Sequence, residues 1–323
     1  MRKEEKYKKK EEDEEDNMKD KKVIFMGTPL FACPVLEALI ENTNVVAVIT
    51  QPDKEVGRKR LLTPSPIKEI AIKNNIEVYT PIKIKDEIEK INSIDADIIV
   101  TCAYGQIIPE EILYHPKYHT INVHASLLPN YRGGAPIQRA IMNGDDKTGI
   151  TIMFTDKGMD SGDIITSKSI PIDINDNIET LSKKLSNLGA TLLIDTLPSI
   201  FNNTCKKIKQ SNEQCSFSPI IKREDEKINF NDKAINIYNK IRALSNIGAY
   251  ASIDDLNIKI FSCSIGDKST KEVGTITIDK DIKVSTIDND IIIKELQIPG
   301  KKRISSKDYL NGNLKELKGK KFN

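Results

Sequence analysis

Between residues 22 and 203 the chain alternates short β-branched runs with segments of helical periodicity. The apolar runs read "VIFMG", "VVAVIT", "DIIVTCA", "TINVHA" and "GITIMFT", and a long helix is predicted from about residue 177 to 201. Strands that alternate with helices along the chain form a mostly parallel sheet with helices on both faces. Ligands of such sheets bind at the carboxyl ends of the strands. We therefore predict an α/β domain whose site lies at that edge.

After residue 221 the pattern changes to short strands bounded by Gly, Asn and Asp, as in "AYASI", "NIKIFSCSIG" and "VGTITI". This pattern is typical of a small antiparallel β-barrel. The first 22 residues hold nine basic and nine acidic side chains, so we expect a disordered or solvated extension, and Met18 is an alternative start. The predicted division is a charged extension (1–20), an α/β domain (21–203), a polar linker (204–221) and a β domain (222–323).

The composition excludes several classes of protein. With 49 basic and 47 acidic residues the net charge is only +2, so a nucleic acid would have to be bound by local basic patches. The five cysteines form no C-x-x-C pair and the chain has three histidines, which argues against a structural zinc site. No run of about 18 apolar residues occurs. We expect a cytoplasmic protein that needs no metal and acts as a monomer.

Two polar residues close the run "TINVHA", at the predicted carboxyl end of a strand. Asn122 and His124 are two residues apart, so on an extended strand they point to the same face. A histidine can take a proton near neutral pH, and an asparagine amide can donate a hydrogen bond to an oxyanion. Asp160, in the loop after the neighbouring strand "GITIMFT", is placed to orient His124. This combination suits direct acyl or formyl transfer.

Each of these residues also has a simpler structural interpretation. Asn122 and His124 could be hydrogen-bonded residues at a strand end, and Asp160 could only form a turn. The run "YRGGAP" could be a loop before a helix that begins at Pro136. The basic run around residues 54–60 could be a solvated surface loop.

The runs "INVHASLLPNYRGGAPIQ" and "GITIMFTDKGMDSGDII" resemble the formyltetrahydrofolate-dependent formyltransferase family. The resemblance implies a Rossmann-like domain followed by an OB-like β-barrel, 10-formyltetrahydrofolate as co-substrate, and a catalytic set of Asn122, His124 and Asp160. It also implies that folate lies against two segments of the chain. These comprise Ser126, Leu127, Leu128, Pro129, Tyr104, Gly105, Gln106 and Ile107.

Further runs resemble one branch of this family, whose members formylate the α-amine of methionyl initiator tRNA for translation initiation. They are "VIFMGTPLFACPVLEAL", "TQPDKEVGRKRLLTPSPIK", "IIKREDEKINFN" and "LQIPGKKRISSKDYLNG". The branch implies that initiator methionyl-tRNA is a partner and that basic side chains bind it. The candidates are Arg58, Lys59, Arg60, Arg132, Lys301, Lys302 and Arg303.

Three other functions remain open at this point. A formyltransferase acting on a small amine, such as an amino-sugar nucleotide or glycinamide ribonucleotide, would share Asn122, His124 and Asp160 but would not need the basic regions. An RNA-binding module with an inactive core would not need the three polar residues. A dinucleotide-binding dehydrogenase is disfavoured because the chain has neither G-x-G-x-x-G nor a P-loop sequence.

Overall fold

The structure is a computed structural model that describes residues 18–57, 59–312 and 317–323. The chain divides into two compact units. The first unit comprises the residues up to Gly134, Gly149–Ile170 and Ser182–Phe217. The second unit comprises Ala135–Thr148, Pro171–Leu181 and Ser218–Asn323. The expected charged extension lies, apart from residues 18–20, outside the described residues.

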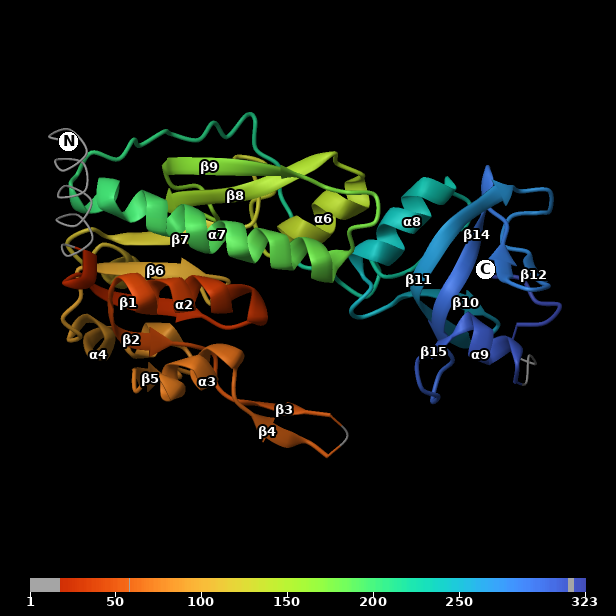
Figure 1. Ribbon diagram of the computed structural model, residues 1–323, viewed down its shortest axis with the longest axis horizontal. Coiled ribbons are helices and arrows are strands. Elements are labelled where there is room, and N and C mark those ends of the chain that lie inside the picture. The colour runs from red at the N-terminus through yellow and green to blue at the C-terminus, as the bar shows by residue number, and fades with distance from the viewer. Residues whose placement is uncertain (1–17, 58, 313–316) are drawn as a thin grey trace, which may run out of the picture. The chain divides into compact units, whose positions relative to one another are not determined.

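A seven-stranded sheet forms the centre of the α/β part, with strand order β5-β2-β1-β6-β7-β8-β9 (Figure 1). The five strands from β5 to β7 pair in parallel, and β8 runs antiparallel to β7. Strands β1 and β6 are almost continuously apolar because the sheet is covered on both faces. The bounds are β1 Lys22–Gly27, β2 Asn44–Ile49, β5 Glu77–Tyr79, β6 Ile98–Cys102, β7 Thr120–His124, β8 Lys147–Phe154 and β9 Ile164–Pro171.

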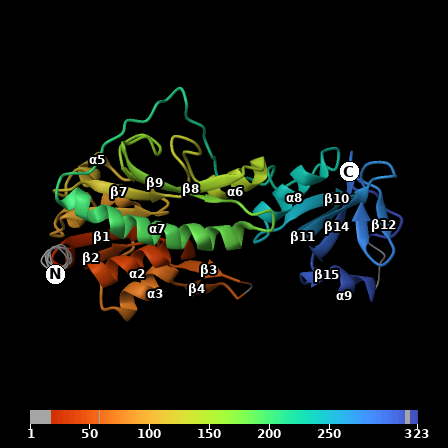
Figure 2. The ribbon, with the colours of Figure 1, turned by 45° about the horizontal axis from the view of Figure 1, so that its top comes forward.

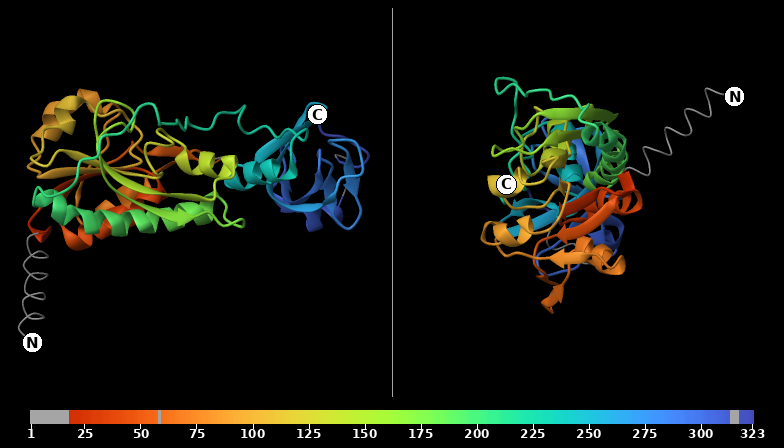
Figure 3. Two further views of the ribbon diagram at one scale, coloured as in Figure 1. Left: turned by 90° about the horizontal axis from the view of Figure 1, so that it is seen from above. Right: turned by 90° about the vertical axis from the view of Figure 1, so that its left-hand side faces the viewer.

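Helices cover both faces of this sheet, as Figures 2 and 3 show. On one face lie α2 and α7, and Ser186 Oγ of α7 donates a hydrogen bond of 2.6 Å to the carbonyl oxygen of Phe31. On the other face, side chains of α4 and α5 pack on Ile24, Met26 and Ile99. The bounds are α2 Cys33–Asn42, α3 Pro66–Lys73, α4 Ile88–Asn92, α5 Glu110–Leu113 and α7 Ile178–Phe201, with short 3-10 helices at Leu30–Ala32 and Ile84–Asp86.

The basic run after β2 forms a β-hairpin, whereas the sequence predicted a loop. Strand β3 (Lys54–Val56) pairs antiparallel with β4 (Leu61–Thr63). All the described side chains of both strands are exposed, including the apolar Leu61 and Leu62. Two strands of three residues each are too short to show the alternation from which a hairpin could be predicted.

The second unit holds an antiparallel sheet of six strands in the order β10-β11-β14-β13-β12, with β15 paired to β14. Its core is mainly isoleucine, with Phe230 and Phe322 stacked at a ring-centroid distance of 5.2 Å. The predicted fold class, a mostly parallel α/β domain followed by a small antiparallel β domain, is thus confirmed. The bounds are α6 Pro136–Asn143, α8 Ala234–Ala243, β10 Ala249–Ile253, β11 Leu256–Lys268, β12 Ile276–Ile278, β13 Ile282–Val284, β14 Asn289–Gln297, β15 Ile304–Ser305 and α9 Ser306–Leu310.

Two further properties bear on the expected class of protein. Within the described ranges, no helix combines the length and apolar character that crossing a membrane requires. Among the same residues, His, Cys, Asp and Glu side chains form no group of three or more that could hold a metal ion. The five cysteines are all free thiols.

Candidate active site

The last residues of β7 place two polar side chains inside the α/β part of the chain. Asn122 and His124 lie on β7, which runs between β6 and β8. His124 is only 6% exposed, and its Nε2 lies 3.0 Å from the carbonyl oxygen of Tyr131. Because a carbonyl oxygen can only accept, Nε2 carries the hydrogen in this contact. The imidazole is therefore held in a fixed orientation by the loop that follows β7.

Asp160 joins these two residues, as the order of the strands predicts. Its Oδ1 accepts a hydrogen bond of 3.4 Å from Asn122 Nδ2, and its Oδ2 lies 3.6 Å from His124 Nδ1. Oδ2 also accepts a 2.8 Å hydrogen bond from the backbone N–H of Gly133. The distance to His124 is longer than a hydrogen bond, so the two groups form a charge pair when the ring is protonated. The structure thus brings all three predicted polar side chains together.

The backbone around Asp160 is unusual and tightly packed. Asp160 has φ = +46°, in the left-handed region that few residues other than glycine adopt. Two residues later, a Cβ on Gly162 would lie 1.9 Å from the carbonyl oxygen of Phe154. Only glycine fits at position 162, because the loop returns directly against the end of β8. This close approach holds Asp160 beside β7.

Thr101, at the end of β6, holds Asn122 in a contact that was not predicted from the sequence. It lies opposite Asn122 in the β6–β7 register, and its Oγ1 donates a 2.9 Å hydrogen bond to Asn122 Oδ1. Because this oxygen accepts, the NH2 group of Asn122 faces Asp160. The runs "DIIVTCA" and "TINVHA" form neighbouring strands. Aligning the carboxyl ends of these two strands was the only way to infer from the sequence that Thr101 lies beside Asn122.

The two predicted folate segments follow β6 and β7, which are parallel neighbours, and so lie at the same edge of the sheet. In the first, Tyr104 is buried, and burial raises the pKa of its hydroxyl well above the usual range. The carbonyl oxygen of Tyr104 accepts hydrogen bonds from Thr28 Oγ1 and Gln51 Nε2. Gly105 has φ = +88°, and Gln106 Oε1 accepts a hydrogen bond from the backbone N–H of Ile84.

The segment ends at Ile107, which is 91% exposed. An apolar side chain this exposed beside a functional edge is a candidate contact for a planar ligand. In the second segment, Ser126 is completely buried and its Oγ donates a 2.6 Å hydrogen bond to the carbonyl oxygen of Asn130. Leu127 is partly buried, Leu128 is buried, and its peptide bond to Pro129 is cis.

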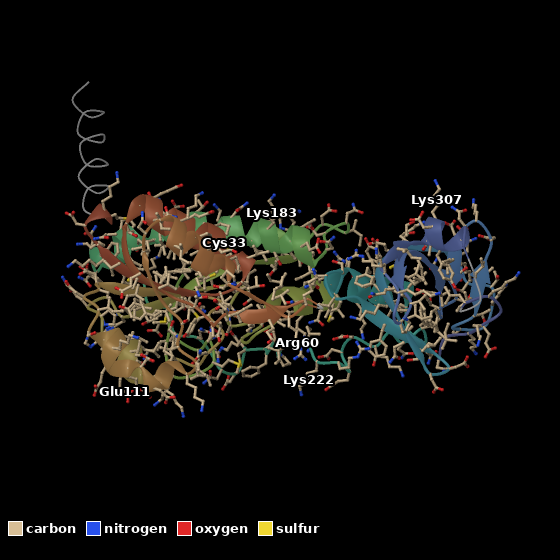
Figure 4. All side chains as sticks on the ribbon, turned by 90° about the horizontal axis from the view of Figure 1, so that it is seen from below. Cys33, Arg60, Glu111, Lys183, Lys222 and Lys307 are labelled. Atoms are coloured by element: carbon tan, nitrogen blue, oxygen red, sulfur yellow. The ribbon has the colours of Figure 1, made fainter. Side chains whose placement is uncertain are left out.

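The predicted tRNA-binding residues occupy several different places. Lys59 and Arg60 are exposed at the turn of the β3–β4 hairpin, where Figure 4 labels Arg60. Arg58 lies outside the described residues. Three exposed basic residues follow β14 in the second unit, and the guanidinium of the last lies 4.2 Å from the ring centroid of Phe261. We call these three the basic turn: Lys301, Lys302 and Arg303.

Arg132 is not at the surface. It is only 4% exposed, its Nε donates to Gln210 Oε1 and its Nη1 donates to Asn212 Oδ1, each at 3.0 Å. Its Nη2 is buried and has no hydrogen-bond partner among the described residues. This placement does not suit the contact with tRNA that was expected from the sequence, because the guanidinium would first have to leave two side-chain amides. The sequence could not indicate this burial, because an arginine in a Gly-rich loop is usually exposed.

Comparison with known proteins defines the class of protein to which this fold and site belong. The sequence pattern of the formyl transferase family matches residues 21–197, and that of the formyl transferase C-terminal domain matches residues 220–314. The chain belongs to the formyl transferase family. It is therefore an enzyme that transfers a one-carbon group. Members of this family use formyltetrahydrofolate as the donor.

Particular relatives narrow this further. Methionyl-tRNA formyltransferase of Staphylococcus aureus strain MW2 is 48% identical over 308 residues, which cover 93% of this chain and 99% of the relative. An N-formyltransferase from Helicobacter canadensis, solved in complex with folinic acid and dTDP-3-aminofucose, is 25% identical with a TM-score of 0.64, covering 85% of this chain and 98% of that one. HypX from Aquifex aeolicus, solved in complex with tetrahydrofolic acid, shares the fold alone, at 14% identity, with a TM-score of 0.65 over 93% of this chain and 48% of that one.

Proposed function

We propose that this protein transfers the formyl group of 10-formyltetrahydrofolate to the α-amine of methionyl initiator tRNA. The observation that carries the proposal is the 48% identity to a methionyl-tRNA formyltransferase over 99% of that relative's length. Both matched domains take part in this identity, so the likeness is not confined to the part shared with other formyltransferases. The arrangement of Asn122, His124 and Asp160 supports the same chemistry.

The reaction is a direct attack of the amine nitrogen on the formyl carbon. Negative charge develops on the former carbonyl oxygen, where an N–H of Asn122 can stabilise it. One hydrogen of the Asn122 amide faces Asp160, and the second, which has no acceptor among the residues that the structure describes, is available to the oxyanion. As the intermediate collapses, the bond from the formyl carbon to the folate nitrogen breaks, the amine loses one proton, and the folate nitrogen gains one.

His124 is the group that we assign to this proton exchange. Its ring is held between two acceptors, the carbonyl oxygen of Tyr131 and the carboxylate of Asp160. A carbonyl oxygen accepts an imidazole N–H, and a carboxylate attracts a protonated imidazole. Asp160 therefore serves as the group that orients His124 and stabilises its charged form.

Folate is expected at the carboxyl edge of β6 and β7, against the two segments 104–107 and 126–129. Backbone groups there, together with the exposed side chain of Ile107, offer the planar and polar contacts that a pterin needs. For tRNA, we assign Lys59 and Arg60 of the hairpin and the basic turn, all of which are exposed. Exposed basic side chains of this kind can contact the phosphates of the RNA backbone.

A small-amine formyltransferase is the second candidate, because the Helicobacter canadensis N-formyltransferase shares the fold and was solved with an amino-sugar nucleotide. The two candidates separate in one assay. The protein is incubated with 10-formyltetrahydrofolate and either methionyl initiator tRNA, free methionine or an amino-sugar nucleotide, and formylated products are measured by mass spectrometry. We expect product from the charged tRNA only, and product from the sugar nucleotide alone would refute the proposal.

Two further parts of the proposal concern the state of the protein in the cell. We place the activity in the cytoplasm, where charged initiator tRNA is used, and we propose that the enzyme acts as a monomer. Analytical ultracentrifugation at the concentrations of the activity assay tests the monomeric state, because a dimer would give twice the molar mass of the chain.

A further inference from the structure

The segment predicted to be a polar linker contains a hydrogen-bonded strap over the active-site loop. We call residues 204–217 the strap, which belongs to the first unit and connects α7 to the second unit along the chain (Figure 1). Near its start, Ile208 exchanges two backbone hydrogen bonds with Ile164, of 2.8 and 2.9 Å. At its end, Ser216 accepts hydrogen bonds from the backbone N–H groups of Tyr131 and Arg132. The strap is thus fixed at both ends to segments that flank the proposed catalytic residues.

Between these two attachments, Gln210 contacts the Asp160 loop directly. Its Nε2 donates hydrogen bonds to the carbonyl oxygens of Asp160, at 2.9 Å, and of Gly162, at 2.7 Å. Its Oε1 accepts from the Nε of the buried Arg132. An arginine can only donate and a carbonyl oxygen can only accept, so the amide of Gln210 has one possible orientation. Arg132 therefore sets which end of the amide faces the loop.

The loop needs such support because its conformation is unfavourable. Asp160 is in the left-handed region, which is unfavourable for a residue with a side chain. Its carboxylate reaches Asn122, His124 and the N–H of Gly133 only while the backbone keeps this conformation. Gln210 donates its two hydrogen bonds to the carbonyl oxygens of residues 160 and 162. These bonds therefore hold the part of the loop whose conformation must be kept.

We propose that Gln210, oriented by Arg132, is a positioning residue that holds Asp160 against Asn122 and His124 during formyl transfer. It touches neither the formyl group nor the amine in this proposal, and acts only through the Asp160 loop. The inference rests on the proposed function. It reassigns Arg132 from the tRNA-binding surface to the support of the active site, where its buried position fits.

The first test is the steady-state formylation of methionyl initiator tRNA by wild type, Gln210→Ala, Gln210→Glu and Asn212→Ala. A displacement of Asp160 acts on the chemical step, so we expect kcat of Gln210→Ala to fall roughly 10- to 100-fold with little change in KM for tRNA or folate. Gln210→Glu keeps the bond to Arg132 but turns a carboxylate oxygen toward two carbonyl oxygens, so its loss should be at least as large. Asn212 bonds to the same arginine without touching the loop, so Asn212→Ala should lower kcat less than Gln210→Ala does.

The second test separates positioning from a general effect on the fold. Gln210→Ala is combined with Asp160→Ala, and the two single variants complete a double-mutant cycle. If Gln210 acts through Asp160, its replacement should change kcat less than about twofold once Asp160 is gone. A merely structural role would lower kcat by the same factor in both backgrounds, and that result overturns the inference.

The remaining outcomes are also decisive. Circular dichroism and thermal unfolding establish that each variant folds, and if Gln210→Ala does not, Gln210→Glu carries the test. Wild-type kcat in the folded Gln210 variants overturns the inference and leaves the proposed function intact. A wild-type enzyme that formylates no charged tRNA overturns the proposed function, and with it the inference that depends on it.

Discussion

Replacing Asp160 by asparagine tests the proposed active site at the residue where most of its contacts meet. The carboxylate accepts hydrogen bonds from Asn122 Nδ2 and from the backbone N–H of Gly133, and lies 3.6 Å from His124 Nδ1. Asparagine has a single oxygen, so in Asp160→Asn the NH2 group must face one of these two donors. The substitution therefore removes a charge and breaks a hydrogen bond while changing the side-chain volume very little.

The expected size of the effect follows from the distance to His124. Two unit charges 3.6 Å apart attract by about 4 to 5 kcal/mol at an effective dielectric constant of about 20. The Asp160 side chain is 20% exposed, and screening by water reduces this to roughly 2 to 3 kcal/mol. If the attraction is felt only when His124 is charged in the transition state, kcat should fall by a factor of roughly 30 to 150.

The assay is the formylation of methionyl initiator tRNA, measured as kcat and KM for both substrates. Asp156→Asn is the matched control, because it removes the same charge from the same loop. Asp156 Oδ1 accepts from the backbone N–H of Gly158, a bond that an asparagine oxygen can keep. We expect Asp156→Asn to remain near wild type. If Asp160→Asn loses no more activity than this control, Asp160 has only a turn-forming role.

Three further predictions concern the loop, a partly buried ion pair and the surface. Gly162→Ala should lower the free energy of unfolding by about 1 to 3 kcal/mol, because its Cβ would overlap the carbonyl oxygen of Phe154. In the control Gly158→Ala, the new Cβ meets chiefly the Ser161 side chain, which can rotate away. If denaturant titrations show an equal loss of stability in the two variants, this explanation is wrong. The bidentate hydrogen bond from Arg139 holds the pKa of Asp225 below its usual range. The stability that Asp225→Asn removes should therefore be fully present above about pH 4 and vanish as the pH falls through the lowered pKa. A difference in melting temperature between wild type and Asp225→Asn that persists at pH 2 would refute this. Alanine substitution of the basic turn should flatten the dependence of tRNA affinity on salt, by roughly 0.7 to 0.9 in logarithmic slope for each phosphate that the turn no longer neutralises, and an unchanged slope would remove this turn from the tRNA-binding surface.

The sheet was predictable because its strands are buried on both faces. "VIFMG" and "DIIVTCA" are apolar almost throughout, and strands of that kind occur in parallel sheets covered by helices. The meeting of Asn122 with His124 followed from the two-residue period of a strand, and the approach of Asp160 followed from pairing between neighbouring strands. Local patterns therefore sufficed for these two placements, but not for the Thr101–Asn122 hydrogen bond, which also joins adjacent strands.

Long-range polar contacts could not be predicted in this way. Gln210 lies 50 residues after Asp160 in a run of polar side chains, and its composition resembles that of a solvated linker. The burial of Arg132 depends on two amides about 80 residues away. A side chain reveals its charge and length in the sequence, but whether a partner lies opposite depends on how distant segments fold back. The β3–β4 hairpin was missed for a different reason, because both its strands are short and exposed.

The order in which the chain enters its two units has a practical consequence for dissecting the enzyme. The chain passes from one unit to the other after Gly134, Thr148, Ile170, Leu181 and Phe217. A truncation near residue 220 would therefore leave α6 behind without the residues it is grouped with, including the Asp225 partner of Arg139. Neither limited proteolysis at one bond nor expression of an amino-terminal fragment can yield the two halves intact. RNA recognition and catalysis in this enzyme are best separated by point substitutions in the full-length protein.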